Sequence, residues 1–100
     1  MLPAERLEKS NTTENLWLYI LVLLRDQSRY GWEIPKLIED KFNFRPGKIT
    51  PYRVFYRLES DGFATSYIKE RRRIYEITDM GKKELNKAKI IYKNILNILG

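Results

Sequence analysis

The sequence predicts a mainly helical α+β fold, and two observations lead to that class. Apolar residues recur at helical spacing in four stretches between residues 12 and 99, whereas residues 63–78 alternate with the two-residue period of β-strands. A chain of 100 residues has the size of one domain. Because 43% of its residues are hydrophobic and 13% are aromatic, the chain is apolar enough to fold around a core.

The first full helix is predicted over residues 12–26. Asn11 and Glu14 have the spacing of a capping box, and apolar residues nearly encircle the segment, which is expected at the centre of the core. The apolar run at 16–24 is shorter than the about 20 residues of a membrane-spanning helix, and no secretory leader precedes it. We therefore predict no membrane segment and a cytoplasmic location. Residues 1–12 are an N-terminal extension, which forms a helical turn or two or frays.

The second and third helices are predicted from apolar spacing and from proline. The second carries Ile34, Leu37, Ile38 and Phe42 at helical spacing. Pro35 is tolerated in it only within the first turn. A loop containing Pro46 and Gly47 follows. The third helix is expected over residues 51–61, with Thr50 as its N-cap and Pro51 at its first position.

The remaining chain predicts a β-hairpin and a final helix. Two β-favouring runs flank the short polar link Glu-Arg-Arg-Arg at 70–73, without an Asn-Gly or Asp-Gly turn. Residues 79–99 are helical again. Three helices, a hairpin and a long helix follow the order of a winged helix-turn-helix. We expect that domain over 1–78, including the extension, and a C-terminal dimerisation helix over 79–100.

Charge and composition narrow the function. The net charge is +6, and residues 45–73 carry most of the excess, with eight basic and three acidic side chains. A localised basic patch is typical of a nucleic-acid surface. Histidine and cysteine are absent, which removes the commonest general base and the usual metal ligands. The sequence therefore predicts no enzyme, no metal site and no cofactor.

The third predicted helix separates two kinds of side chain. On a helical wheel, one side holds Pro51, Val54, Phe55 and Leu58. The opposite side holds Tyr52, Arg53, Tyr56 and Arg57. Arginine pairs with guanine in the major groove, and tyrosine bonds phosphate or packs on thymine methyl groups. The alternative is an ordinary surface helix whose arginines pair with acids. Its only acids, Glu59 and Asp61, do not serve both arginines, so we favour DNA contact.

Arginines at the predicted hairpin tip add a second basic element. Arg71, Arg72 and Arg73 lie together next to Lys69, as suits a minor groove or its flanking phosphates. The alternative is a charged turn that protects an edge strand. The candidate DNA-binding residues are Tyr30, Lys48, Thr50, Tyr52, Arg53, Tyr56, Arg57, Lys69, Arg71, Arg72 and Arg73.

The final helix carries an apolar seam at alternating intervals of three and four residues. The seam consists of Leu85, Ala88, Tyr92, Ile95 and Leu99. Because a helix after the hairpin has little core left to cover, we expect this seam to bind a second copy of the chain. The alternative is that the helix packs back on its own domain. A two-fold dimer would read a roughly palindromic operator.

Three motifs together resemble the PadR-like family of winged-helix transcriptional regulators. They are YGWEIPKLIE at 30–39, TPYRVFYRLESDGF at 50–63 and RRRIYEITDMGKKEL at 71–85. The chain departs from the family pattern at Ile49, Arg53 and Glu70. The resemblance implies a homodimeric DNA-binding regulator, and it adds a small hydrophobic effector as a candidate partner. Trp17, Trp32 and Tyr92 are candidates for lining an aromatic pocket.

These observations predict a sequence-specific regulator that binds double-stranded DNA as a homodimer, and specifically a repressor. Two alternatives stay open at this point. One is an architectural or RNA-binding winged helix without sequence preference, and the other is a protein–protein adaptor.

Overall fold

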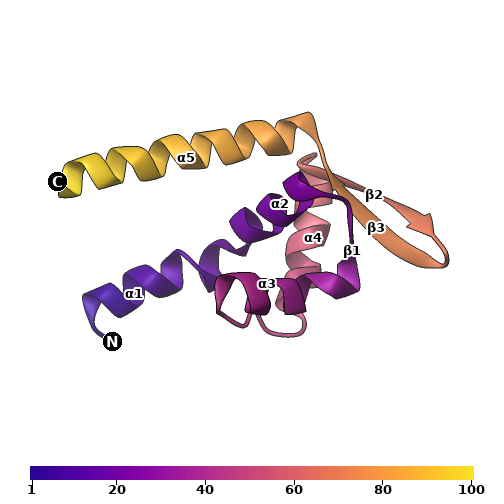
Figure 1. Cartoon of the computed structure of the whole chain (residues 1–100), viewed down its shortest axis with the longest axis horizontal. Helices are drawn as coiled ribbons and strands as arrows, with labels where there is room; N and C mark the ends of the chain where they lie inside the picture. Colours follow the sequence, from indigo (N-terminus) through magenta and orange to yellow (C-terminus); the bar gives the residue numbers. More distant parts are fainter.

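The computed structural model describes all residues 1–100, within an elongated envelope of 49 × 28 × 21 Å (Figure 1). The helices are α1 (Pro3–Ser10), α2 (Leu16–Asp26), α3 (Ile34–Phe42), α4 (Thr50–Ser60) and α5 (Asp79–Leu99). The strands are β1 (Arg29–Tyr30), β2 (Ala64–Lys69) and β3 (Arg72–Ile77), and short 3-10 turns span Thr13–Asn15 and Gly31–Glu33. The predicted fold class, a mainly helical winged helix-turn-helix, is confirmed.

Helix α2 lies at the centre of the core, as its encircling apolar residues predict. Five of its eleven residues are buried, and they belong to one core cluster with buried side chains of α3, α4, β2 and α5. The cluster comprises Leu16, Ile20, Leu21, Leu23, Leu24, Ile34, Ile38, Phe55, Leu58, Ala64 and Leu85. None of the helices combines the length and apolarity needed to cross a membrane.

The chain breaks between α1 and α2, so the predicted helix over 12–26 is wrong at its start. Asn11 ends α1 instead of capping the next helix, because its backbone N–H and its side-chain Nδ2 both donate to the carbonyl oxygen of Leu7. The Thr12 hydroxyl donates to the carbonyl of Glu8 at 2.8 Å. Short polar side chains often form such hydrogen bonds to backbone carbonyls, which compete with the helical hydrogen bonds and favour a helix end. The N-terminal extension is thus a helix, and none of its residues is buried.

Strand β1 is an element that the sequence does not predict. Its two residues pair antiparallel with β3, Arg29 opposite Tyr75 and Tyr30 opposite Ile74, and the sheet order is β1-β3-β2. The Arg29 side chain is buried, and its Nε donates to the carbonyl of Leu23 at 3.3 Å. A strand of two residues is too short to show any alternation, and therefore carries no periodic signal.

The N-termini of α3 and α4 follow their prolines. Pro35 occupies the first turn of α3, as predicted. Helix α4 begins at Thr50 itself, and the preceding residue Ile49 makes no side-chain capping bond. The prediction of Thr50 as N-cap is therefore wrong by one position.

The β2–β3 hairpin, or wing, is confirmed, with a tighter turn than the sequence indicates. Lys69 pairs with Arg72, which leaves Glu70 and Arg71 as a two-residue connection with φ angles of 52° and 64°. Positive φ at both positions is the type I′ geometry, which matches the twist of a hairpin and favours Asn and Gly. The chain places two residues there whose Cβ atoms disfavour this region.

Replacing Glu70 with Asn is expected to stabilise the fold by about 0.5–1 kcal/mol, because Asn tolerates the left-handed region better than Glu. Thermal unfolding should show a rise in Tm of roughly 2–6 °C. Glu70→Gln is the matched control, since it removes the charge and keeps the backbone cost. An equal gain in both variants would assign the effect to charge and contradict the backbone explanation.

Gly81 marks a close approach between the start of α5 and the base of the wing. The Thr78 hydroxyl caps α5 by accepting from the Gly81 N–H at 3.1 Å, and it donates to the carbonyl of Gly62 at 2.7 Å. A Cβ on Gly81 would overlap the carbonyl oxygen of Phe63 and lie 2.7 Å from Cγ1 of Ile77. The close approach of α5 to Phe63 and Ile77 therefore requires glycine at position 81.

Candidate nucleic-acid interface

Helix α4 presents the two faces that its sequence predicts. Pro51, Phe55 and Leu58 are buried against the core. Tyr52, Arg53, Tyr56 and Arg57 are exposed, and Tyr56 is 77% exposed. The exposed face thus offers two guanidinium groups and two phenols to one partner.

Arg57 forms an ion pair with Asp61 one turn later, at 3.3 Å between Nε and Oδ2. Both side chains are exposed, so water and salt screen the pair and its net contribution is about 0–1 kcal/mol. A phosphate or a guanine edge can therefore replace the carboxylate at low cost. The pairing that the ordinary-surface alternative requires is present for this arginine, whereas Arg53 forms no ion pair.

The wing is fastened to α4 by a chain of polar contacts. The Ser66 hydroxyl on β2 donates to a carboxylate oxygen of Glu59 on α4. The same hydroxyl accepts from Nη1 of Arg73 on β3 at 2.9 Å. Ser66 thus connects both wing strands to Glu59 of α4, and this connection holds the basic residues of the wing next to those of α4.

Aromatic packing supports the same junction from inside. The Tyr75 ring on β3 stacks on Phe55 of α4 at 4.4 Å between centroids. Burial raises the pKa of the Tyr75 phenol, and the Glu59 carboxylate adds to the rise. A phenol whose pKa lies above its ordinary value of about 10 is neutral at physiological pH. Tyr75 therefore acts as an uncharged packing residue.

The arginines of the wing do not form the single tip cluster that the sequence predicts. Only Arg71 lies in the turn, while Arg72 and Arg73 lie in β3. Consecutive strand residues point to opposite faces of a sheet. Arg73 accordingly contacts Ser66, whereas Arg72 places its Cζ atom 5.4 Å from the ring centre of Trp32. Lys69 lies opposite Arg72 and shares its face.

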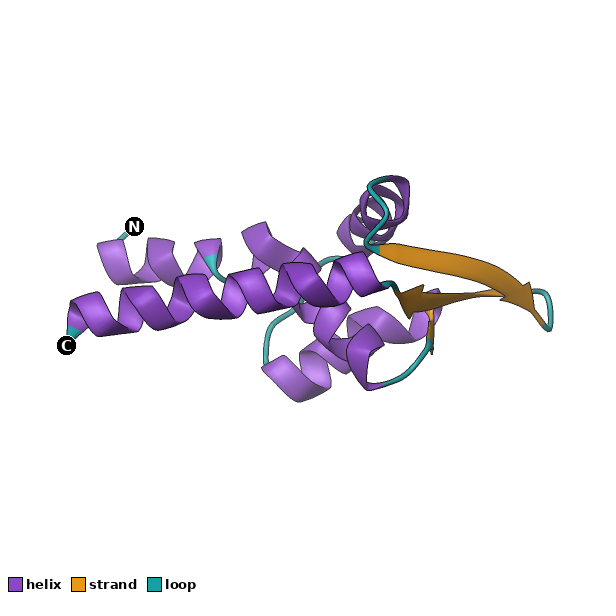
Figure 2. Cartoon of the chain, turned by 90° about the horizontal axis from the view of Figure 1, so that it is seen from above, coloured by secondary structure: helices purple, strands orange, loops and turns teal.

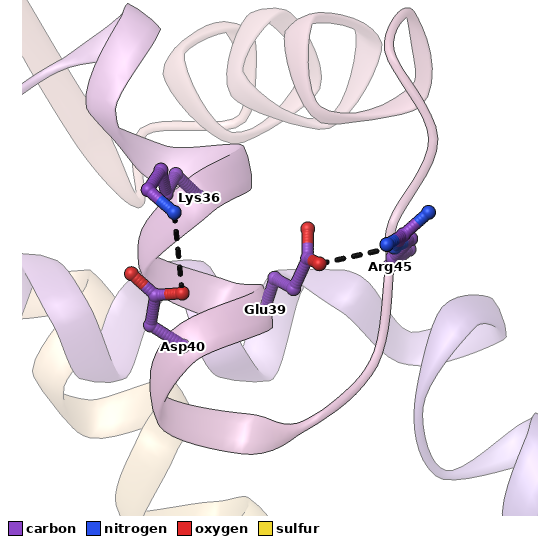
Figure 3. A network of polar contacts seen from close by, with 4 residues as sticks. All are labelled: Lys36, Glu39, Asp40 and Arg45. Atoms are coloured by element: carbon purple, nitrogen blue, oxygen red, sulfur yellow. Dashed lines mark hydrogen bonds and ion pairs between the residues drawn. The ribbon is translucent and has the colours of Figure 1, made fainter.

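Helix α3 and the loop that follows it add two cations, Lys36 and Arg45, that are not among the predicted DNA-binding residues. Lys36 pairs with Asp40 at 3.5 Å and Arg45 pairs with Glu39 at 3.0 Å (Figure 3). Together with Lys48, Lys36 and Arg45 border a hollow of about 570 Å³ beside Tyr52. The sequence does indicate a role for Arg45, because this residue begins the basic segment at 45–73. Lys36 is balanced by acids in the sequence and gave no signal.

The predicted dimer seam divides into two halves. Leu85 and Ala88 are buried in the core of their own domain, so the expectation that α5 has little core to cover is wrong for its first half. The second half lies outside the core, and its seam residues Tyr92, Ile95 and Leu99 are 36%, 46% and 74% exposed.

Helices α1 and α5 project together from the end of the molecule opposite the wing, and both chain termini lie there (Figures 1 and 2). Two tyrosine hydroxyls donate to Asn11, each at 2.6 Å. The Tyr92 hydroxyl donates to the side-chain Oδ1 of Asn11, and the Tyr19 hydroxyl donates to the backbone carbonyl oxygen of Asn11. Asn11 therefore joins α1, α2 and α5. Further exposed apolar residues on the two projecting helices are Met1, Leu2, Leu7, Ile91, Leu96 and Ile98.

The three aromatic residues considered for one pocket belong to different clusters. Trp17 donates to Asn15 and lines a groove of about 440 Å³ between α2, α4 and α5. Trp32 contacts Arg72 and Tyr30 near the wing, and Tyr92 contacts Asn11. No group of three or more His, Cys, Asp or Glu side chains is placed to hold a metal ion.

Solved structures with the same architecture are transcriptional regulators. One from Clostridium thermocellum matches with a TM-score of 0.76 and 31% identity, over 84% of this chain and 88% of its own. A PadR family regulator from Clostridium difficile matches at 0.71 and 28% identity, over 84% of this chain and 97% of its own.

Bacillus subtilis PadR, solved in complex with operator DNA, matches with a TM-score of 0.65 and 29% identity, over 75% of this chain and 46% of its own. The same regulator has also been solved with p-coumaric acid. The sequence itself matches the PadR-like family of transcriptional regulators over residues 20–87. Because this match extends from α2 through the wing into α5, the chain belongs to the PadR-like family of transcriptional regulators.

Proposed function

We propose that the protein binds double-stranded DNA with sequence specificity, inserting α4 into a major groove while the wing contacts the adjacent backbone. The observation that carries this proposal is the exposed face of Tyr52, Arg53, Tyr56 and Arg57 on a helix to which the wing is fastened. The B. subtilis regulator of the same fold has been solved with operator DNA, which supports the same use of this surface.

The remaining candidates supply contacts to the DNA backbone. The helix dipole at the start of α4 favours a phosphate near Thr50 and Lys48. Lys36 and Arg45 border the same hollow and extend this phosphate site. On the wing side, the contributing residues are Tyr30, Lys69, Arg71, Arg72 and Arg73.

We infer that the regulator works as a homodimer, with residues 1–78 reading DNA and residues 79–100 joining two copies. The exposed apolar surfaces of α1 and of the second half of α5 support this arrangement, since a partner would cover both. Two-fold symmetry places the two α4 helices at half-sites about one helical turn apart, on a roughly palindromic operator. Repression by occlusion requires DNA binding alone, so we favour a repressor.

Selection of bound sequences from a random duplex pool tests binding, specificity and half-site spacing together. Enrichment of one palindromic motif supports the proposal. An architectural or RNA-binding protein would bind without an enriched motif, and an adaptor would bind no duplex even at low salt. Affinity for the selected site relative to random DNA then gives the specificity.

Replacing Arg57 with Ala is expected to weaken operator binding by about 1–3 kcal/mol and to relax preference at one base position. Fluorescence anisotropy on the selected operator and its single-base variants would measure both effects. Arg25→Ala is the matched control, because Arg25 is also an exposed arginine beside an aspartate, 4.0 Å from Asp26. Equal losses in both variants would mean that Arg57 acts through net charge, and would remove it from the specific contacts.

A small hydrophobic effector is a second proposal, supported by the groove of about 440 Å³. Trp17, Val54 and Phe63 give it apolar walls, and Arg53 and Arg57 border it. An occupant would therefore touch the DNA-reading helix directly. Titration with p-coumaric acid, the aromatic acid found with the B. subtilis regulator, is a suitable first probe.

A further inference from the structure

Trp32 is an exposed indole with two specific neighbours. It lies in the turn Gly31–Glu33 before α3 and is 57% exposed. Its ring stacks on Tyr30, with 6.2 Å between centroids and 22° between planes. Its second neighbour is Arg72, whose guanidinium Cζ lies over the indole ring, 5.4 Å from the ring centroid. A large apolar side chain left this exposed, yet held by a stack and a cation, is a candidate for a functional contact.

The turn Gly31–Glu33, which carries Trp32, lies close to both basic elements. A Cβ at Gly31 would lie 3.2 Å from the Tyr75 ring and 3.9 Å from the Tyr52 ring, so this turn sits against both the wing and α4. The register pairs Tyr30 with Ile74, which shares a strand face with Arg72. The turn that carries Trp32 therefore lies against both α4 and the wing, and its indole contacts the wing arginine.

We propose that Trp32 is a positioning residue, which holds Arg72 of the wing in the orientation that contacts a DNA phosphate. This inference rests on the proposed DNA-binding function. A guanidinium carries five N–H donors, so a contact with one indole face leaves donors available for phosphate oxygens. The Arg72 side chain forms no hydrogen bond or ion pair within the chain, whereas the Arg73 side chain donates one hydrogen bond to Ser66.

Pre-orientation matters because a free arginine side chain loses many rotamers when it binds. The stack on Tyr30 fixes the indole, and the indole in turn restricts Arg72. Without Trp32 the same arginine would reach the backbone from a mobile ensemble, and affinity would fall although no direct DNA contact had been removed.

A double-mutant cycle on operator affinity tests the coupling. Trp32→Ala is expected to weaken binding about two- to fivefold, the range of an exposed cation–π contact. In an Arg72→Ala background the same change should have no further effect. Arg73 is the matched control, because it is the neighbouring strand arginine on the other face, and Trp32→Ala with Arg73→Ala should give additive losses. Additive losses with Arg72→Ala would overturn the proposal.

The conservative series separates positioning from bulk. Trp32→Phe should recover part of the affinity, since benzene also attracts a cation, whereas Trp32→Leu should behave like Ala. Full recovery by Leu would show that only apolar volume matters and would also overturn the proposal. Thermal unfolding checks that each variant folds, and the Phe and Leu pair remains informative should Ala lower stability.

The proposed DNA-binding function and the positioning role of Trp32 are contradicted by different results. If the parent protein binds no duplex at low salt, the proposed function fails before any variant is compared. If the parent binds its operator and the Trp32–Arg72 cycle is additive, the function stands and only the positioning role is lost.

Discussion

Replacing Ile95 and Leu99 with Glu is expected to yield a folded monomer whose operator affinity is at least about 100-fold below that of the parent protein. Both residues are exposed on the second half of α5, so charges there leave the core of the domain intact. A dimer binds its second half-site intramolecularly, which raises affinity by about 10²–10⁴ over a single site. Breaking the dimer removes that gain.

Ile90→Glu is the matched control for this prediction. Ile90 is also an isoleucine on α5 and is 59% exposed, but helical spacing places it on the side opposite the Tyr92 stripe. Sedimentation should report a dimer for Ile90→Glu and a monomer for the double variant, with equal helicity by circular dichroism. A double variant that sediments as a dimer would refute the interface. Leu85 is unsuitable for this test, because it is buried in its own domain and a charge there would unfold the chain.

Replacing Gly81 with Ala is expected to destabilise the fold by about 2–4 kcal/mol, although Ala is the better helix former. The new methyl group would overlap a backbone carbonyl, that of Phe63, instead of a side chain that could rotate. That carbonyl is itself held, since it accepts from the Thr78 N–H at 3.2 Å. Relief therefore requires α5 to move away from the wing, which opens the core at Leu85.

Thermal or urea unfolding would measure this loss, with a fall in Tm of roughly 10 °C or more expected. Lys82→Ala is the control, because Lys82 is exposed in the same helical turn and its truncation should change stability by less than about 0.5 kcal/mol. A Gly81→Ala variant as stable as the control would mean that the base of the wing is more compliant than its hydrogen bonds indicate.

The long periodic segments could be predicted because burial imposes one repeating pattern on many residues. Helix α2 and the two faces of α4 follow directly from apolar spacing, and Pro35 correctly fixes the start of α3. The prediction of Asn11 as an N-cap was wrong because the same polar residue types begin one helix and end another. Strand β1 offers no pattern to read at two residues long.

The candidate site shows the same division. Exposure of Tyr52, Arg53, Tyr56 and Arg57 followed from the helical period alone. The wing arginines required the hairpin register, because one residue decides which face a strand side chain occupies. The contact between Trp32 and Arg72 joins residues 40 positions apart, and only the folded arrangement reveals it. Burial of Leu85 and Ala88 likewise depends on where α5 returns along α2.

Helix α5 is continuous over its 21 residues, anchored in the core at one end and free at the other. A dimer joined through its exposed end would have no flexible linker between the point of assembly and α4, the proposed DNA-reading helix. In such a dimer, the continuous helix α5 would fix the distance between the two α4 helices. Inserting one base pair at the operator centre would turn one half-site by about 34° relative to the other. A dimer with a fixed distance between its α4 helices would bind the altered operator weakly. We therefore expect its targets to be defined as much by the spacing between half-sites as by the bases within them.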